Sequence, residues 1–367
     1  NLRIPGPTPC PPEVLDQVGE PMINHRGPEF KVLINSVTAK LKRVFQTRED
    51  LFILTSSGTG AMEASIVNTL SPGDPVLCVS VGAFGDRYRA IAEAYGLNVT
   101  RMDVEWGKIA DPNEIRKALK ANPAIKAVII THNETSTGVT NDLAAISKVV
   151  KGEFNKLLLV DAISSMGCLP LPTDEWRIDV VGTSSQKGFM VPPGLAFISF
   201  GQQAWQAYAS AKLPRNYFDL KAAKHYLEDL GQTPWTPAVS IFYGLDISLD
   251  MMLAEGLESV FARHHRLAEY TRQNVKAMGL SLYADESCAA DTVTAVTIPE
   301  GVDGNRLVGL MREEHNVVLA GGQGKLVGKI FRIGHLGHCS EEDLRAVFVA
   351  LEAVLPKVGF KPKARAR

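Results

Sequence analysis

Residues 51–60, LFILTSSGTG, join a short apolar run to a turn of small and hydroxylated residues. The run at 51–55 is typical of a strand buried on both faces, and residues 61–70 fit a helix. Free backbone N–H groups at such a helix start, beside glycines that permit close approach, can bind a phosphate. Read alone, the turn is equally typical of a hydroxyl-rich helix cap without a ligand.

The same order of strand, turn and helix continues to residue 200. Six further apolar runs predict strands at 75–81, 98–104, 127–131, 157–161, 178–181 and 195–200. Helices are predicted between or before them at 12–18, 31–45, 86–95, 112–120 and 143–150. This alternation predicts an α/β fold with a mainly parallel seven-stranded sheet flanked by helices.

The organisation changes after residue 201. A helical stretch at 240–278 is broken near Gly256, and short strands and helices follow it at 281–283, 293–298, 304–314, 317–319, 330–333 and 341–355. This mixture predicts a smaller α+β domain. We expect an extended, proline-rich N-terminal arm with a short helix at 1–20, a large domain at 21–255 and a small C-terminal domain at 256–367.

Composition excludes several classes of function. A net charge of −1 gives no indication of a nucleic-acid or membrane partner, and no apolar run approaches the roughly 18 residues of a membrane span. The five cysteines are scattered and unpaired in sequence, which is typical of reduced thiols and a cytoplasmic location. His335 and His338 have no third ligand nearby in the sequence, so no metal site is predicted.

Lys187 lies in the segment GTSSQKG at 182–188, directly after a predicted strand. A lysine held at a strand end can be partly desolvated, which lowers its pKa and makes the neutral amine available to form a Schiff base. Judged alone, the segment fits a surface lysine in a polar turn better.

Other polar and aromatic side chains follow other strands. Asp161 ends one strand, Phe84 lies between glycines where it could stack on a planar ligand, and Asn133 and Thr135 belong to a loop that can hydrogen-bond. Open α/β sheets bind ligands at the carboxyl ends of their strands, so these residues are expected to meet. A phosphate cradle, a stacking ring, an acid and a lysine are the parts needed to hold pyridoxal phosphate.

The motifs Ser57-Gly58-Thr59, Phe84, Asp161 and Ser185-Gln186-Lys187, in this order, resemble those of fold type I pyridoxal-phosphate enzymes. The resemblance is to the class V aminotransferases, and within them to the alanine–glyoxylate and serine–glyoxylate (serine–pyruvate) branch. It extends from about residue 5 to residue 351.

The resemblance implies roles for the cofactor-binding residues. Lys187 would carry the cofactor as a Schiff base and then move the proton at the substrate Cα, while Asp161 would pair with the pyridine nitrogen. Phe84 would stack on the ring, in a place where the family often has tryptophan. The phosphate would be bound by Ser57, Gly58, Thr59 and Gln186.

The resemblance also implies contacts to the substrate and to a second subunit. Arg332 would grip the substrate carboxylate, with the backbone of Gly6 contacting the same group. Thr236 would reach the phosphate of a neighbouring subunit, which implies a homodimer with shared sites. Thr233 stands where the family has a tyrosine that assists in this. Either Asn133 or Thr135, with Thr135 favoured, would bond the cofactor's phenolic oxygen.

The expected activity is a ping-pong transfer of an amino group from serine or alanine to glyoxylate or pyruvate. A second candidate is transamination of aspartate, with Arg26 as an extra guanidinium for the side-chain carboxylate, although Arg26 also fits an ordinary polar loop. A third is a non-catalytic subunit that keeps the fold. A desulfurase is disfavoured because Gln186 stands where that class has histidine.

Overall fold

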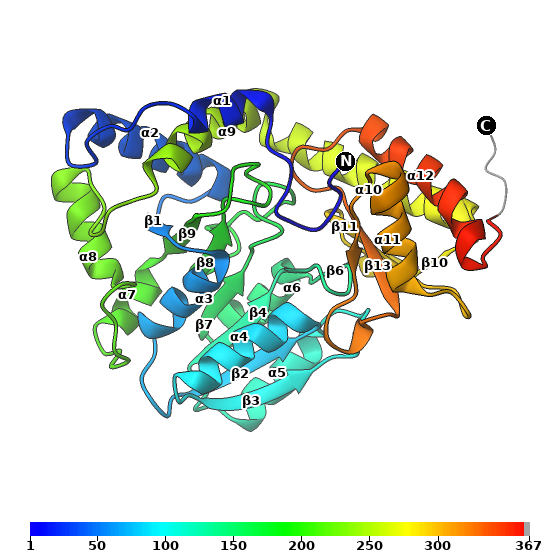
Figure 1. The fold of residues 1–367 in the computed structure, drawn as a ribbon. Coiled ribbons are helices and arrows are strands. Elements are labelled where there is room, and N and C mark those ends of the chain that lie inside the picture. The colour runs from blue at the N-terminus through cyan, green and yellow to red at the C-terminus, as the bar shows by residue number, and fades with distance from the viewer. Residues whose placement is uncertain (363–367) are drawn as a thin grey trace.

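A seven-stranded sheet organises the larger part of the chain in the computed structural model, which describes residues 1–362 (Figure 1). The strand order is β1-β9-β8-β7-β4-β2-β3. Only β9 runs against its two neighbours, so the predicted mainly parallel seven-stranded sheet is confirmed. The strands are β1 (Asp50–Thr55), β2 (Pro75–Ser80), β3 (Asn98–Asp103), β4 (Ala127–Thr131), β7 (Leu157–Asp161), β8 (Val180–Ser184) and β9 (Leu195–Phe200).

Strand β8 begins two residues later than predicted, at Val180 rather than at residue 178. Asp179 accepts a hydrogen bond from the Leu158 N–H through its side chain, at 2.8 Å, so the backbone ladder with β7 starts only after it. Strand β8 ends at Ser184, directly before the segment that contains Lys187.

Helices cover both faces of the sheet because successive strand residues point to opposite sides. Ile53 packs into a core with the helices α2, α5 and α9, whereas the adjacent Phe52 packs into a separate core with α3 and α4. The helices around the sheet are α1 (Pro12–Val18), α2 (Pro28–Phe45), α3 (Gly58–Val67), α4 (Ala83–Ala94), α5 (Pro112–Ala121), α6 (Leu143–Ser147), α7 (Gln202–Tyr208), α8 (Leu220–His225) and α9 (Val239–Glu255).

A second sheet, with four antiparallel strands in the order β10-β11-β13-β12, lies beside the first one (Figure 1). Three helices pack on it around a core that includes Leu267, Phe331 and Phe348. These elements are β10 (Ser281–Leu282), β11 (Val293–Thr297), β12 (Ala320–Gly321), β13 (Ile330–Gly334), α10 (Leu257–Ala277), α11 (Gly304–His315) and α12 (Glu341–Val354). The exact domain boundaries stay a prediction.

The break at Gly256 and the segment at 317–319 were both predicted from the sequence. The long helical stretch is broken at Gly256, as predicted, where φ is +84°. The segment predicted at 317–319 is displaced, because Val318 forms an isolated bridge with Leu2 and the strand β12 begins only at Ala320.

The N-terminal arm connects the two sheets. Gly334 of β13 donates its N–H to the carbonyl of Arg3 at 2.7 Å, and Thr8 donates its N–H to the carbonyl of Gln186 at 3.0 Å. The arm therefore runs from the small sheet to the segment after β8, as Figure 1 shows. No helix within residues 1–362 is long and apolar enough to cross a membrane.

Candidate active site

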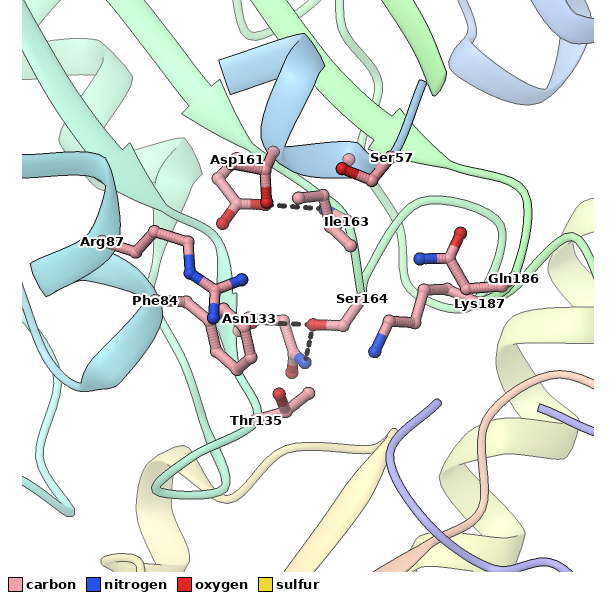
Figure 2. A pocket seen from close by; sticks show the side chains of 12 residues that line it. Ser57, Phe84, Arg87, Asn133, Thr135, Asp161, Ile163, Ser164, Gln186 and Lys187 are labelled. Atoms are coloured by element: carbon pink, nitrogen blue, oxygen red, sulfur yellow. Dashed lines mark hydrogen bonds between the residues drawn. The ribbon is translucent and has the colours of Figure 1, made fainter. Parts of the chain in front are cut away.

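A cavity of about 180 Å³ lies at the carboxyl ends of β4, β7 and β8 (Figure 2). It is lined from the start of α3, from α4, and from the segments that follow the three strands. The lining residues are Ser57, Gly58, Thr59, Phe84, Arg87, Asn133, Thr135, Asp161, Ile163, Ser164, Gln186 and Lys187. Most of the residues singled out in the sequence therefore surround one cavity.

The start of α3 is built to approach an anion closely. Ser57 precedes the helix in an extended conformation, and its side chain makes no capping hydrogen bond. A Cβ atom on Gly58 would lie 2.6 Å from the Cδ1 of Ile163, so only glycine fits between the start of α3 and Ile163. The buried Ser184 Oγ and Gln186 Oε1 have no hydrogen-bond partner within residues 1–362. Buried polar atoms of this kind normally have a partner. The Ser184 hydroxyl can donate to an anion at the helix start, whereas Gln186 Oε1 can only accept a hydrogen bond.

Lys187 extends into the cavity from the segment after β8 (Figure 2). Its Nζ donates to the carbonyl of Pro5 at 2.5 Å, and Thr8 Oγ1 donates to the carbonyl of Lys187 at 3.0 Å. Burial lowers the pKa of the amine to about 8; Asp161 opposes this shift, while Arg332 and Arg87 add to it. A substantial fraction of the amine is therefore neutral near physiological pH.

Gly6 lies against this amine. A Cβ atom at Gly6 would fall 2.4 Å from Nζ of Lys187, and the φ of +122° disfavours any other residue. The arm thus closes one side of the space around Lys187 with bare backbone.

Asp161, at the end of β7, is a buried carboxylate with few partners. Its Oδ1 accepts from the N–H of Ile163 at 2.9 Å, and its Oδ2 accepts from Thr131 Oγ1 at 3.3 Å. Burial raises the pKa of this carboxyl to about 7, and the nearby Glu134 acts in the same direction. A cation placed beside Asp161 would reverse this shift.

The backbone of Phe84 is held by Glu134, which the sequence reasoning missed. This fully buried carboxylate accepts from the N–H groups of Phe84 and Gly85, both at 3.0 Å, and from Oγ of Ser136 at 2.6 Å. A Cβ on Gly82 would come within 2.4 Å of the Glu134 side chain. The only indication of this role in the sequence is that Glu134 lies among small and hydroxylated residues shortly after a predicted strand.

Arg332 belongs to β13 and is not among the lining residues, but it is bound to one of them. Nη1 donates to the carbonyl of Thr135 at 3.1 Å and Nε to the carbonyl of Gly321 at 2.9 Å. Within residues 1–362, Nη2 makes no hydrogen bond, and burial lowers the pKa of the guanidinium to about 10. The arginine is thus fixed by two backbone carbonyls beside the cavity, with one nitrogen still available.

The loop after β4 distinguishes Asn133 from Thr135. The amide of Asn133 donates to Ser164 Oγ at 2.7 Å and to Thr292 Oγ1 at 2.8 Å, and its oxygen accepts from Thr140 Oγ1 at 2.8 Å. The side-chain hydroxyl of Thr135 makes no hydrogen bond within residues 1–362 and remains available to a ligand.

Two predicted site residues lie away from the cavity. Thr236 is exposed, on the loop that precedes α9. Arg26 donates to the carbonyls of Thr233 and Pro234, at 2.7 and 3.1 Å, and to Gln232 Oε1 at 2.8 Å. The guanidinium of Arg26 therefore fixes the same loop that carries Thr236.

The family of the chain follows from a comparison with models of known families. Residues 2–339 match the model described as aminotransferase class-V. The chain belongs to the class-V aminotransferases. It is a pyridoxal-phosphate-dependent transaminase with a mixed α/β fold.

Individual relatives of this class-V aminotransferase carry different names. A protein of Synechococcus sp. (strain PCC 6716) named soluble hydrogenase, small subunit, is 48% identical, over 98% of this chain and 94% of the relative. The L-aspartate–glyoxylate aminotransferase of Paracoccus denitrificans is 40% identical, over 98% and 92%. Among solved structures, the alanine–glyoxylate aminotransferase of Nostoc sp. has a TM-score of 0.93 and 32% identity, over 96% and 94% of the two chains.

The cavity of this class-V aminotransferase fits pyridoxal phosphate. The unpartnered hydroxyl of Ser184 can donate a hydrogen bond beside the α3 start and so suits the phosphate, and the buried Asp161 suits a protonated ring nitrogen. Lys187 offers an amine with a lowered pKa to the aldehyde. Within residues 1–362, no group of three or more His, Cys, Asp and Glu residues is arranged to hold a metal ion.

Proposed function

We propose that the chain transfers an amino group from serine or alanine to glyoxylate or pyruvate by a ping-pong reaction at the cavity around Lys187. The observation that carries this proposal is the lysine amine in that cavity, flanked by the buried Asp161 and by the anchored Arg332. Two of the relatives named above, the L-aspartate–glyoxylate and the alanine–glyoxylate aminotransferases, have glyoxylate in their names, which supports this choice.

Most residues that line the cavity have a distinct part in this function. Pyridoxal phosphate, when bound, withdraws electrons from the Cα of the attached amino acid. Asp161 would hold the ring nitrogen protonated, Phe84 would stack on the ring and Thr135 would bond its phenolic oxygen. Ser57, Gly58, Thr59 and Gln186 would hold the phosphate. Lys187, through which the cofactor is bound, would take and return the proton at Cα, for which a pKa of about 8 is well matched.

The substrate carboxylate would be received by Arg332 and by the backbone of Gly6. Nη2 of Arg332 is free to bind the carboxylate. The guanidinium is already held by two backbone carbonyls, so less side-chain entropy is lost when the substrate binds. Gly6 lies against the Lys187 amine, so a carboxylate held there would place Cα close to Nζ.

A homodimer with shared sites would use the loop at 231–237, in which Trp235 and Thr236 are exposed. Thr236 has no role in the cavity of its own chain, and Trp235 beside it is 39% exposed and stacks on the exposed Tyr217, with ring centroids 5.9 Å apart. An exposed aromatic pair is typical of an interface. Arg26 would hold this loop in position from within the same subunit.

A screen of single half-reactions tests the proposed donors. Enzyme loaded with pyridoxal phosphate is mixed with one amino acid at a time, and the loss of the visible absorption band is followed. We expect serine and alanine to discharge the band and glyoxylate or pyruvate to restore it. Discharge by neither amino acid would refute these donors.

Replacing Asp161 with asparagine should alter the pH dependence of stability in the cofactor-free protein. The folded-state pKa of about 7 lies above the unfolded value of roughly 3.9, so the stabilisation by the bound proton is full below about pH 4 and disappears as the pH rises through 7. Asparagine keeps an acceptor for the Ile163 N–H but does not titrate.

Between pH 5 and pH 8 the stability of the variant should rise relative to the parent by about 2–3 kcal/mol. Urea unfolding of both cofactor-free proteins at the two pH values measures this difference. The same variant should bind pyridoxal phosphate more weakly. A stability difference that does not change with pH would mean that Asp161 is already ionised in the empty cavity.

A further inference from the structure

Arg87 lines the cavity but has no part in the function proposed above. It lies one turn along α4 from Phe84, and its guanidinium carbon is 4.9 Å from the centroid of the Phe84 ring. Figure 2 shows the guanidinium entering from the α4 side of the cavity, opposite the side from which Lys187 and Gln186 extend. The ring contact orients the cation without occupying any of its N–H donors.

The acidic side chains near Arg87 on α4 and β3 form hydrogen bonds or ion pairs with other residues. Asp86 accepts from Ser80 Oγ at 2.8 Å and pairs with Arg89 at 3.1 Å, while Arg89 also pairs with Asp103 at 2.5 Å. Within residues 1–362, Arg87 makes no hydrogen bond and no ion pair. Its charge nevertheless acts inside the cavity, because it contributes to the lowered pKa of Lys187.

The other two arginines considered for this cavity are held differently. Arg332 is anchored by the carbonyls of Thr135 and Gly321, which suits one carboxylate at a fixed place. Arg26 donates three hydrogen bonds to the loop at 231–237 and does not line the cavity. Arg87 in the cavity and Arg332 beside it are therefore two guanidinium groups on separate elements, whereas serine, alanine, glyoxylate and pyruvate each carry a single carboxylate.

We propose that Arg87 binds a second carboxylate, so that this site also accepts dicarboxylic amino acids and the corresponding 2-oxo diacids. The planar guanidinium can bind a carboxylate through two parallel hydrogen bonds, and its stacking on Phe84 reduces the side-chain entropy lost on binding. The substrate's first carboxylate lies at Arg332 and its second at Arg87. This inference rests on the aminotransferase function proposed above.

The first test compares aspartate with alanine as donors to the loaded enzyme and to Arg87→Met. Methionine keeps the length and the apolar contact with Phe84 but removes the charge. We expect kcat/KM for aspartate to fall by roughly 10- to 100-fold, the effect of losing hydrogen bonds between charged groups, and kcat/KM for alanine to change by less than about threefold. Arg87→Lys should restore part of the aspartate activity.

Arg101→Met is the matched control. Arg101 is another exposed arginine, on β3, which pairs with Glu93 outside the cavity. Its replacement removes the same charge and should leave the ratio of aspartate to alanine activity unchanged. Equal losses on both substrates in Arg87→Met, or no loss on aspartate, would overturn the role of Arg87.

A second measurement does not depend on turnover. Succinate and butyrate have the same chain length but carry two carboxylates and one, and neither can be transaminated. Calorimetry with the loaded enzyme should show tighter binding of succinate, and this advantage should disappear in Arg87→Met and persist in Arg101→Met. If no amino acid reacts, the proposed function fails, while the succinate comparison still decides whether Arg87 binds a second carboxylate.

Discussion

Lys187→Ala is expected to reduce transamination by about 10⁴-fold or more, because the variant loses both the amine that binds the cofactor covalently and the base at Cα. The effect should fall on kcat for every amino acid. Cofactor should still bind, since Ser57, Gln186 and Asp161 remain. Single-turnover measurements with serine and alanine, together with cofactor titration, give both quantities.

Lys126→Ala is a suitable control for this variant. Lys126 is an exposed lysine that pairs with Asp74 at 2.7 Å and lies outside the cavity. Its removal should leave turnover unchanged. If Lys187→Ala retained more than a few per cent of the parent activity, another residue would have to provide the proton transfer.

Arg332→Ala is expected to lower kcat/KM for all amino acids by roughly 10²- to 10³-fold, because a charged contact to the substrate carboxylate is removed. The loss should appear mainly in KM. Reaction with ethylamine, which is alanine without its carboxylate, should be affected far less. The ratio of alanine to ethylamine activity therefore isolates the carboxylate contact from general damage to the site.

Two further observations complete this test. Arg332→Lys keeps the charge but loses the fork, so it should recover only part of the activity. Thermal unfolding of both variants reports the loss of the bonds to Thr135 and Gly321. An unchanged alanine-to-ethylamine ratio in Arg332→Ala would contradict the proposed role.

Local patterns predicted the large sheet well because its strands are buried on both faces. Runs such as LFIL and LLLV have few alternatives to a central strand, and parallel order then brings their carboxyl ends together. For this reason Ser57, Asp161 and Lys187 could be expected around one cavity from the chain alone. The start of β8 could not, because it depends on a bond between Asp179 and Leu158 across the sheet.

Local sequence patterns could not predict contacts between segments that are distant in the chain. The bond from Arg332 to the Thr135 carbonyl joins the two sheets across 197 residues of sequence, and only the resemblance to a family suggested Arg332. Glu134 and Arg87 were missed because their roles depend on backbone groups and on a ring that approach them in three dimensions. Arg26 and Thr236 were named, but within one chain they lie outside the cavity.

Borohydride reduction of the protein loaded with pyridoxal phosphate, followed by peptide mapping, tests whether Lys187 carries the cofactor. We expect a visible absorption band after loading, its loss on reduction, and a phosphopyridoxyl group on the peptide that contains Lys187. A label on a different lysine, or a protein that remains colourless with added cofactor, would contradict this role.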